Sequence, residues 1–377
     1  MIPVSEPFLC GKELENITDC IKSGWISSAG KYIDQFEEQW ATYCNRQYGI
    51  AVSNGTTALD VAVHCLGLKP GDEVIMPTFT IISCALAIVN NNGTPVLVDS
   101  DPKLWTMDVD HVAEKITSKT KAIMPVHIYG HPVDMDPLLD LAEDHNLAII
   151  EDAAEAHGAE YQTQCHSSNT WRRCGSFGTF SCFSFYANKL ITTGEGGMVL
   201  TDDEVLAKKA RAYLNLYFQP PRRFYHESLG NNFRLTNIQA ALGVAQIERM
   251  DDIITKKRWM AQEYSHQLEE LSGLQLPIEE QWAKSVYWMY AFVLSEETGM
   301  DNTEFSLRLL EKGIETRPFF IGMHEQPVFQ KMGLFKDEKY PIAERIAGQG
   351  LYLPSGLTIT SEQIATVSNA VKEILSS

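Results

Sequence analysis

The chain has 377 residues with 31 basic and 49 acidic side chains, a formal net charge of −18. This length allows two domains with separate cores, and a composition of 44% hydrophobic and 21% charged residues is typical of a soluble globular protein. An acidic surface repels nucleic acids and anionic membranes, so neither is an expected partner. The sequence has neither a membrane-length apolar run nor a signal-peptide pattern at its start, so we expect a cytoplasmic protein.

The cysteines are scattered, and none forms a C-x-x-C pair. In a cytoplasmic chain of this size we expect them to be reduced and buried. Cys165, His166 and Cys174 could be considered as metal ligands, but a fourth ligand at metal spacing is missing, so we predict no metal site. The eight positions are Cys10, Cys20, Cys44, Cys65, Cys84, Cys165, Cys174 and Cys182.

The first half of the chain alternates between two patterns. Short apolar runs are typical of buried parallel strands, and the amphipathic stretches between them predict helices. This alternation predicts an α/β architecture with a mostly parallel sheet covered on both faces. We expect helices at 13–22, 34–44, 56–66, 80–91, 109–116 and 136–145, and strands at 73–76, 95–98, 122–126 and 148–150.

The pattern changes after residue 237. A helical stretch at 238–269 precedes a strand-like run at 285–294, and further helices are expected near 302–312 and at 361–375. We therefore predict a large domain at 1–245 and a smaller α+β domain at 246–377. In parallel sheets ligands bind at the carboxyl ends of the strands, so the polar residues that follow the strands are candidates for the site.

Residues 53–57, Ser-Asn-Gly-Thr-Thr, lie between a short strand and a helix. A helix N-terminus carries free N–H groups and a partial positive charge that favour a phosphate, and Gly55 would let the backbone approach closely. The alternative is an ordinary helix cap built from Ser, Asn and Thr.

Residues 149–158 run from an apolar strand into Glu151, Asp152 and Glu155. A buried carboxylate needs a cationic partner, and a protonated pyridine nitrogen would be one. The alternative is an acidic cluster in a strand-to-loop turn.

Lys189 follows the aromatic run 183–186, with Ser184 close by and a Gly-rich turn at 192–197. A lysine among desolvated aromatic side chains has a lowered pKa, which an amine that bonds an aldehyde requires. The alternative is a solvated lysine at the end of a strand. Residues 231–237, with two amides and Arg234 ahead of a helix, suit an anion or a partner subunit, or simply a loop with a cap at Thr236 or Asn237.

Together these segments resemble the DegT/DnrJ/EryC1/StrS sugar aminotransferases. The resemblance rests on S-N-G-T, E-D-A-A-E-A-H-G, F-S-F-Y-A-N-K, T-T-G-E-G-G and N-F-R-L-T-N, and it extends over essentially the whole chain. G-W-I-S-S-A-G-K-Y-I, V-H-I-Y-G, Y-W-M-Y and T-R-P-F-F make the chain most similar to the GDP-perosamine synthase branch of the family.

The resemblance implies a fold type I enzyme that uses pyridoxal 5′-phosphate, and a homodimer with its sites at the interface. Lys189 would bond the cofactor, Asp152 would face the pyridine nitrogen, and Glu155 would contact the ring hydroxyl. Gly55, Thr56 and Ser184 would hold the phosphate, with Asn232 reaching the neighbouring subunit's cofactor. Candidates for binding the sugar nucleotide are Trp25, Ser27, Lys31, Tyr129, His157, Arg222, Tyr287, Arg317 and Phe319.

Three features depart from the family pattern. Ile81 stands where members place an aromatic residue on the cofactor ring, residues 162–174 look longer than usual, and Thr179 replaces a common Asp.

The leading hypothesis is transfer of an amino group from L-glutamate to GDP-4-keto-6-deoxymannose, giving GDP-perosamine for lipopolysaccharide O-antigen synthesis. The alternatives are a dTDP- or UDP-linked keto-sugar or 8-keto-3-deoxy-octulosonate as acceptor, or a non-catalytic regulator that binds the cofactor. Arg222, Arg223, Arg317 and Lys31 could supply positive charge for a nucleotide diphosphate, or could be solvated surface charge.

Overall fold

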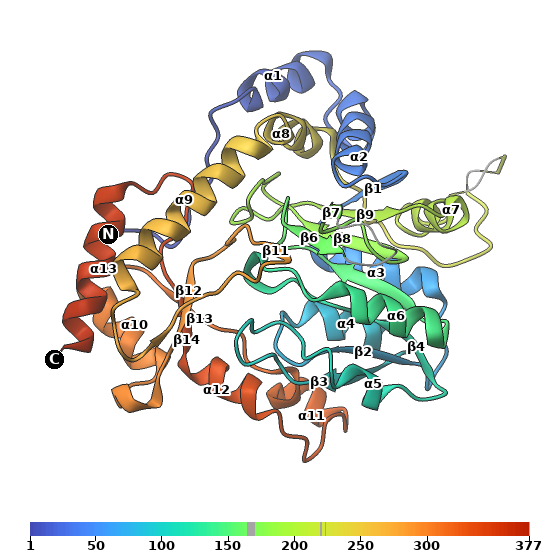
Figure 1. Cartoon of the computed structure of the whole chain (residues 1–377). Helices are drawn as coiled ribbons and strands as arrows, with labels where there is room; N and C mark the ends of the chain where they lie inside the picture. Colours follow the sequence, from blue (N-terminus) through green and yellow to red (C-terminus); the bar gives the residue numbers. More distant parts are fainter. Residues whose placement is uncertain (164–169, 219–220, 223, 377) are drawn as a thin grey trace.

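The computed structural model describes residues 1–163, 170–218, 221–222 and 224–376, and its centre is a seven-stranded sheet (Figure 1). The strand order is β1-β9-β8-β5-β4-β2-β3, and β9 alone runs against the other strands of this sheet. The predicted α/β chain with a large, mostly parallel sheet is therefore confirmed. The strands are β1 (Tyr48–Val52), β2 (Glu73–Pro77), β3 (Thr94–Val98), β4 (Thr120–Ile123), β5 (Ala148–Asp152), β8 (Phe180–Ser184) and β9 (Gly197–Thr201).

Helices cover both faces of this sheet because alternate side chains of each strand point to opposite sides. Val74 and Met76 of β2 pack into the same core as α3 and α4, whereas Ile75 packs into a separate core with α6. Every apolar position of β2 is thus buried, which explains its continuous apolar run in the sequence. The helices of this part are α3 (Gly55–Leu66), α4 (Ser83–Asn90), α5 (Val112–Lys115), α6 (Met135–His145) and α7 (Glu204–Tyr213).

The C-terminal part forms a second core around a four-stranded antiparallel sheet of order β10-β12-β14-β13. The fully buried members of this core all come from residues 260–374, and α9 and α13 pack against each other in it. The division at residue 246 stays a prediction. The elements are α9 (Met250–Leu268), β10 (Leu274–Gln275), β12 (Ala291–Leu294), α10 (Asn302–Glu311), β13 (Arg317–Pro318), α11 (Pro327–Lys331), α12 (Pro341–Gln349), β14 (Gly350–Tyr352) and α13 (Ser361–Leu375).

Two expected elements differ from the structure in more than the position of their ends. The helix expected at 238–269 is two helices, α8 (Asn237–Ile247) and α9, because Arg249 leaves the helical conformation with φ −119° and ψ 14°. Gly243 lets α8 pack on Phe36, whereas Met260, Tyr264 and Leu268 of α9 pack into the C-terminal core. Only the last four residues of the 285–294 run form a strand, since Tyr287 is left-handed with φ 46°.

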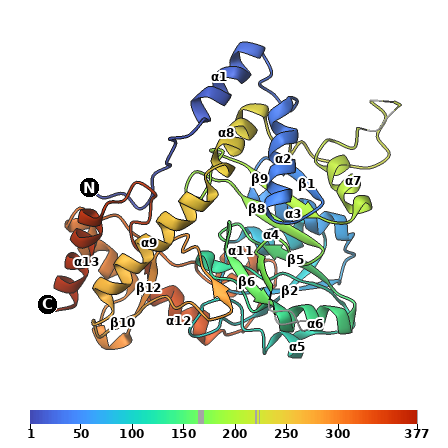
Figure 2. The same ribbon diagram turned by 45° about the horizontal axis from the view of Figure 1, so that its top comes forward.

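Helices α1 (Glu13–Ser23) and α2 (Lys31–Tyr43) lie beside α8, in both views of the molecule (Figures 1 and 2). A small third sheet joins the two parts of the chain: β11 (Ala283–Lys284) pairs with β6 (Glu160–Thr163), which pairs with β7 (Thr170–Arg173). The middle of the long 162–174 stretch, 164–169, lies outside the described residues. Within the described part of the chain, no helix is both long enough and apolar enough to cross a membrane.

The cysteines follow the expectation with one exception. Six of them are free and buried, but Cys10 is exposed because it lies in the extended segment ahead of α1. Cys165 and His166 lie outside the described residues. The buried cysteines are Cys20, Cys44, Cys65, Cys84, Cys174 and Cys182.

Candidate active site

A hollow of about 470 Å³ opens at the carboxyl ends of the parallel strands. Its wall is built from the start of α3 and from the segments that follow β2, β5 and β8, and Trp288, Phe320 and Tyr352 of the C-terminal part close it. Strand ends that are far apart in the sequence meet here because the strands run side by side in the same direction. Six predicted site residues lie together in this wall: Gly55, Thr56, Asp152, Glu155, Ser184 and Lys189.

The start of α3 forms one end of the hollow. Asn54 caps the helix, since its side chain accepts a hydrogen bond of 2.9 Å from the backbone N–H of Thr57. A side chain at Gly55 would place its Cβ 2.6 Å from Cβ of Ser184, so only glycine lets the helix start and β8 approach this closely. The first-turn N–H groups have no acceptors within the helix, so the hollow presents a positive end that suits a phosphate.

Asp152 ends β5 and is buried, with 3% of its surface exposed. One carboxylate oxygen accepts a hydrogen bond of 3.0 Å from the backbone N–H of Ala154, and the other accepts one of 3.2 Å from the thiol of Cys84. Burial raises the pKa of this carboxyl group. A carboxylate in such surroundings is well placed to receive a cation, and a protonated ring nitrogen fits this requirement.

Lys189 and Glu155 meet in the hollow. Nζ of Lys189 lies 3.5 Å from Oε1 of Glu155, whose Oε2 accepts a hydrogen bond of 2.8 Å from the backbone N–H of Tyr129. Burial lowers the pKa of Lys189, although Glu155 and Asp152 oppose the shift, and burial raises the pKa of Glu155 to about 7. A lysine with a lowered pKa loses its proton more readily, as an amine that bonds a carbonyl carbon must.

Trp288 is an unexpected member of the site. The indole ring lies under Lys189, with Nζ 3.6 Å from the ring centroid, and its Nε1–H donates a hydrogen bond of 2.8 Å to the carbonyl oxygen of Asn188. The Y-W-M-Y motif contains this residue, but neither periodicity nor spacing could bring position 288 to position 189. The other lining residues were not expected to bind the cofactor or the substrate: Asn54, Leu59, Thr80, Ser83, Val126, Ala154, Tyr186, Asn188, Glu195, Phe320 and Tyr352.

Ile81 lines the hollow at the position where relatives were expected to carry an aromatic ring. Its side chain is 42% exposed, so it presents an apolar surface to the space inside. Val126 and Ala154 add further apolar surface to the same wall. A flat ring can pack against such aliphatic groups, so the absence of an aromatic residue at position 81 does not conflict with binding of pyridoxal phosphate.

Three candidates for the sugar nucleotide lie near the N-terminus. Trp25 and Lys31 line a second hollow of about 600 Å³ beside Asn237, and Nζ of Lys31 is 2.8 Å from Asp19. The carbonyl oxygen of Ser27 accepts a hydrogen bond of 2.6 Å from the backbone N–H of Asn237, which fixes this segment to the start of α8.

The other candidates are dispersed. Tyr129 and Phe319 are buried against each other, and Tyr129 also stacks on Phe320 and Trp288 of the hollow's wall. His157 is buried among aromatic rings of α2 and β8, and burial lowers its pKa to about 3. The remaining three lie in separate parts of the chain: Arg222, which is exposed above Tyr225, Arg317, which is exposed beside Glu315, and Tyr287, which is half-buried.

Asn232 lies outside the hollow's wall and forms a backbone bridge with Asn215. Beside it, Arg234 donates a hydrogen bond of 2.5 Å to the side chain of Asn215. Residues 215 and 232 are thereby held together. Asn232 could contact a cofactor only in the site of another subunit, because it does not line the hollow of its own chain.

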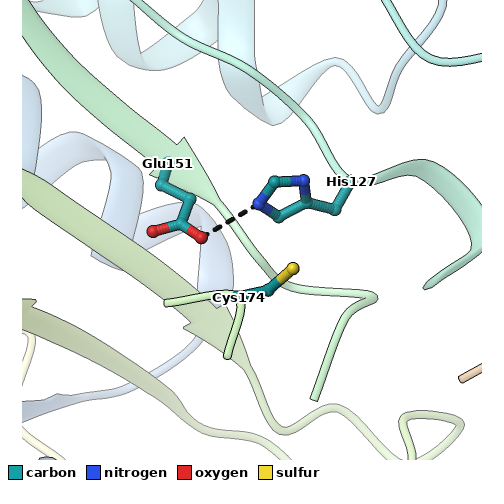
Figure 3. A group of neighbouring side chains, drawn as sticks. All are labelled: His127, Glu151 and Cys174. Atoms are coloured by element: carbon teal, nitrogen blue, oxygen red, sulfur yellow. Dashed lines mark hydrogen bonds and ion pairs between the residues drawn. The ribbon is translucent and has the colours of Figure 1, made fainter. Parts of the chain in front are cut away.

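A buried group next to the active site has the composition of a metal centre. Figure 3 shows the imidazole of His127 pointing at the carboxylate of Glu151, with Cys174 beside them, and their ligand atoms lie within 4.8 Å of one another. However, Nδ1 of His127 accepts a hydrogen bond from the backbone N–H of Val133, which leaves Nε2 as the donor to Glu151.

The carboxylate of Glu151 also accepts hydrogen bonds from the N–H groups of Gly175 and Phe177 and from the hydroxyl of Ser181. A metal ion would have to displace these bonds. We therefore interpret the cluster as a structural network that holds the turn at 175–177 against β5.

The mostly parallel sheet, the buried lysine and carboxylates and the free N–H groups at the start of α3 are features of an aminotransferase of fold type I whose cofactor is pyridoxal 5′-phosphate. Residues 9–372 match the DegT/DnrJ/EryC1/StrS aminotransferase family, and the chain belongs to this family.

The most similar relatives include GDP-perosamine synthase of Escherichia coli O157:H7, which is 42% identical over 100% of this chain and 99% of that protein. GDP-perosamine synthase of Caulobacter vibrioides is 40% identical, over 99% of this chain and 98% of the relative. Among solved structures, the aminotransferase from Psychrobacter cryohalolentis superposes with a TM-score of 0.90 at 30% identity, covering 99% of each chain.

Proposed function

We propose that the enzyme transfers the amino group of L-glutamate to GDP-4-keto-6-deoxymannose and so forms GDP-perosamine. The observation that carries this proposal is the similarity to three GDP-perosamine synthases, 38–42% identical over nearly their full lengths. Perosamine would then serve a surface polysaccharide such as the O-antigen of lipopolysaccharide, and the enzyme would act in the cytoplasm.

Pyridoxal phosphate, when bound, supplies an aldehyde that takes up an amino group and a ring that accepts electrons. Lys189 would bond the aldehyde and, once released, carry the proton between the substrate carbon and the cofactor. Asp152 would keep the ring nitrogen protonated. The residues at the hollow's positive end, Gly55, Thr56 and Ser184, would hold the phosphate, and Glu155 would face the ring hydroxyl.

The enzyme would work as a homodimer in which Asn232 reaches the phosphate on the partner. Large apolar side chains that are exposed in the single chain support this proposal, since buried interfaces take up such surface. Several of them lie in the N-terminal segment and at residues 81–86, next to the hollow at Ile81: Leu9, Leu14, Ile21, Trp25, Ile26, Ile81, Ile82 and Leu86. Trp25 and Lys31 of the second hollow would contribute to binding the sugar nucleotide. The other predicted residues for this role lie outside the linings of the two hollows: Ser27, Tyr129, His157, Arg222, Tyr287, Arg317 and Phe319.

A panel of keto-sugars with L-glutamate as donor tests the proposal, with release of 2-oxoglutarate as the readout. GDP-4-keto-6-deoxymannose should give the highest kcat/KM. A dTDP- or UDP-linked sugar or 8-keto-3-deoxy-octulosonate reacting faster would replace the proposed acceptor. Tight cofactor binding without turnover on any acceptor would favour the regulator instead.

A further inference from the structure

Trp288 contacts Lys189 and also the residue before it, Asn188. The face of the indole lies under Nζ of Lys189, and its Nε1–H holds the carbonyl oxygen of Asn188, the residue just before. The backbone N–H of Trp288 donates a hydrogen bond of 3.0 Å to the carbonyl oxygen of Tyr129. These contacts fix the indole ring, which belongs to the C-terminal part, against Lys189. Trp288 is buried, with 4% of its surface exposed.

A second lysine, Lys257, holds the backbone of Trp288. Lys257 of α9 is buried, and its Nζ donates hydrogen bonds of 2.6 Å to the carbonyl oxygens of Trp288 and Ser355. Among the described residues it has no carboxylate at ion-pair distance, and burial lowers its pKa to about 7. Burying this group is costly, and its two hydrogen bonds offset part of the cost while joining Trp288 to Ser355.

We propose that Trp288 is a positioning residue for the Lys189 amine, which rests on the indole whenever it is not bonded to the cofactor, and that Lys257 holds Trp288 in this place. The inference deepens the proposed function, because it rests on Lys189 as the reacting amine. The indole keeps the amine inside the hollow, next to Glu155, where it can receive and return a proton.

The face of an indole attracts a cation, so the contact with Trp288 favours the protonated form of Lys189. The other groups that act on this amine are Glu155 and Asp152, which raise its pKa, and His157, which is held neutral by burial. Burial itself lowers the pKa of Lys189. Replacing the indole by leucine keeps the site dry but removes the attraction, so the pKa of Lys189 should fall.

The experiment measures the pKa of Lys189 in cofactor-free enzyme from the pH dependence of its acetylation by acetic anhydride, followed by peptide mass spectrometry. Trp288→Leu should lower this pKa by about half a unit to one unit, which makes labelling about three- to tenfold faster at pH values below the pKa. In Trp288→Phe, whose ring attracts a cation less strongly than indole, the pKa of Lys189 should lie between those of wild type and Trp288→Leu. Lys257→Met should lower the pKa in the wild-type background and have no further effect in Trp288→Leu.

Trp259 is the matched control, because Lys256 lies 3.7 Å from its ring centroid in another part of the surface. Trp259→Leu should leave the pKa of Lys189 as in wild type. An unchanged Lys189 pKa in Trp288→Leu, or an equal shift in Trp259→Leu, would overturn the role of Trp288. Equal effects of Lys257→Met in both backgrounds would overturn the anchoring role.

If Lys257→Met does not fold, the pair of Trp288 variants tests the proposal alone. Acetylation uses neither sugar nor glutamate. Failure of the sugar assignment therefore leaves this result untouched, and the reverse also holds.

Discussion

Nζ of Lys189 and Oε1 of Glu155 lie 3.5 Å apart, although the two residues follow different strands of the sheet. Both side chains are largely buried, and burial shifts their pKa values toward each other, downward for the lysine and upward for the glutamate. A pair of this kind can exchange a proton at small energetic cost. It links the proposed chemistry at Lys189 to the protonation state of Glu155.

Replacing Lys189 by alanine should abolish turnover while cofactor binding persists. The lysine would be both the covalent anchor and the proton carrier, and loss of a general acid–base group alone typically costs about 10²- to 10⁴-fold in rate. The measurement is 2-oxoglutarate release beside a titration of cofactor binding. Lys256→Ala, a change on the surface next to Trp259, is the control. Near-normal transamination by the Lys189 variant would disprove the assignment.

Glu155→Gln should change how the stability of cofactor-free enzyme depends on pH. The pKa of Glu155 is raised from 4.5 to about 7, so between these values the folded state binds more protons than the unfolded state. The stability of wild type relative to the variant therefore falls as pH rises through this window and is constant above it. Unfolding in urea at about pH 5 and about pH 7.5 should show a relative loss of about 2 kcal/mol. Parallel behaviour of the two proteins would contradict the shifted pKa.

Gly55→Ala should weaken cofactor binding. The new Cβ would lie 2.6 Å from Cβ of Ser184, so the start of α3 and the end of β8 must separate at the proposed phosphate site. The dissociation constant should rise at least about tenfold, an energy of about 1.4 kcal/mol. Gly348→Ala in α12 is the matched control, since nothing lies within 4 Å of its new Cβ. Equal cofactor affinities of the Gly55 variant and wild type would show that Gly55 is not part of the phosphate site.

Removing metal ions should leave the enzyme unaffected, whereas Glu151→Gln should destabilise it. The four groups that donate hydrogen bonds to the Glu151 carboxylate form a closed network, and breaking a buried network of this kind costs about 1–3 kcal/mol or more. Thermal unfolding before and after dialysis against a chelator, and of the variant, tests both statements. A lower melting temperature after dialysis would instead show that the His127 cluster holds a metal.

The local sequence was sufficient to predict the alternation of strands and helices, the cap at the start of α3, the buried carboxylate after β5 and Lys189 after β8. These features depend on side-chain periodicity and on residues close together in the chain, so they can be recognised without coordinates. The break at Arg249 was missed because it depends on which core each half of the helix packs against.

Only the tertiary structure placed Trp288 under Lys189, Cys84 on Asp152 and Glu155 beside the amine. These contacts join residues from different strands or from the two parts of the chain, and no pattern along the sequence encodes their distance. The sequence by itself determined the chemical groups and their order. The packing of the C-terminal part against the strand ends decided how these groups face one another and how far burial shifts their pKa values.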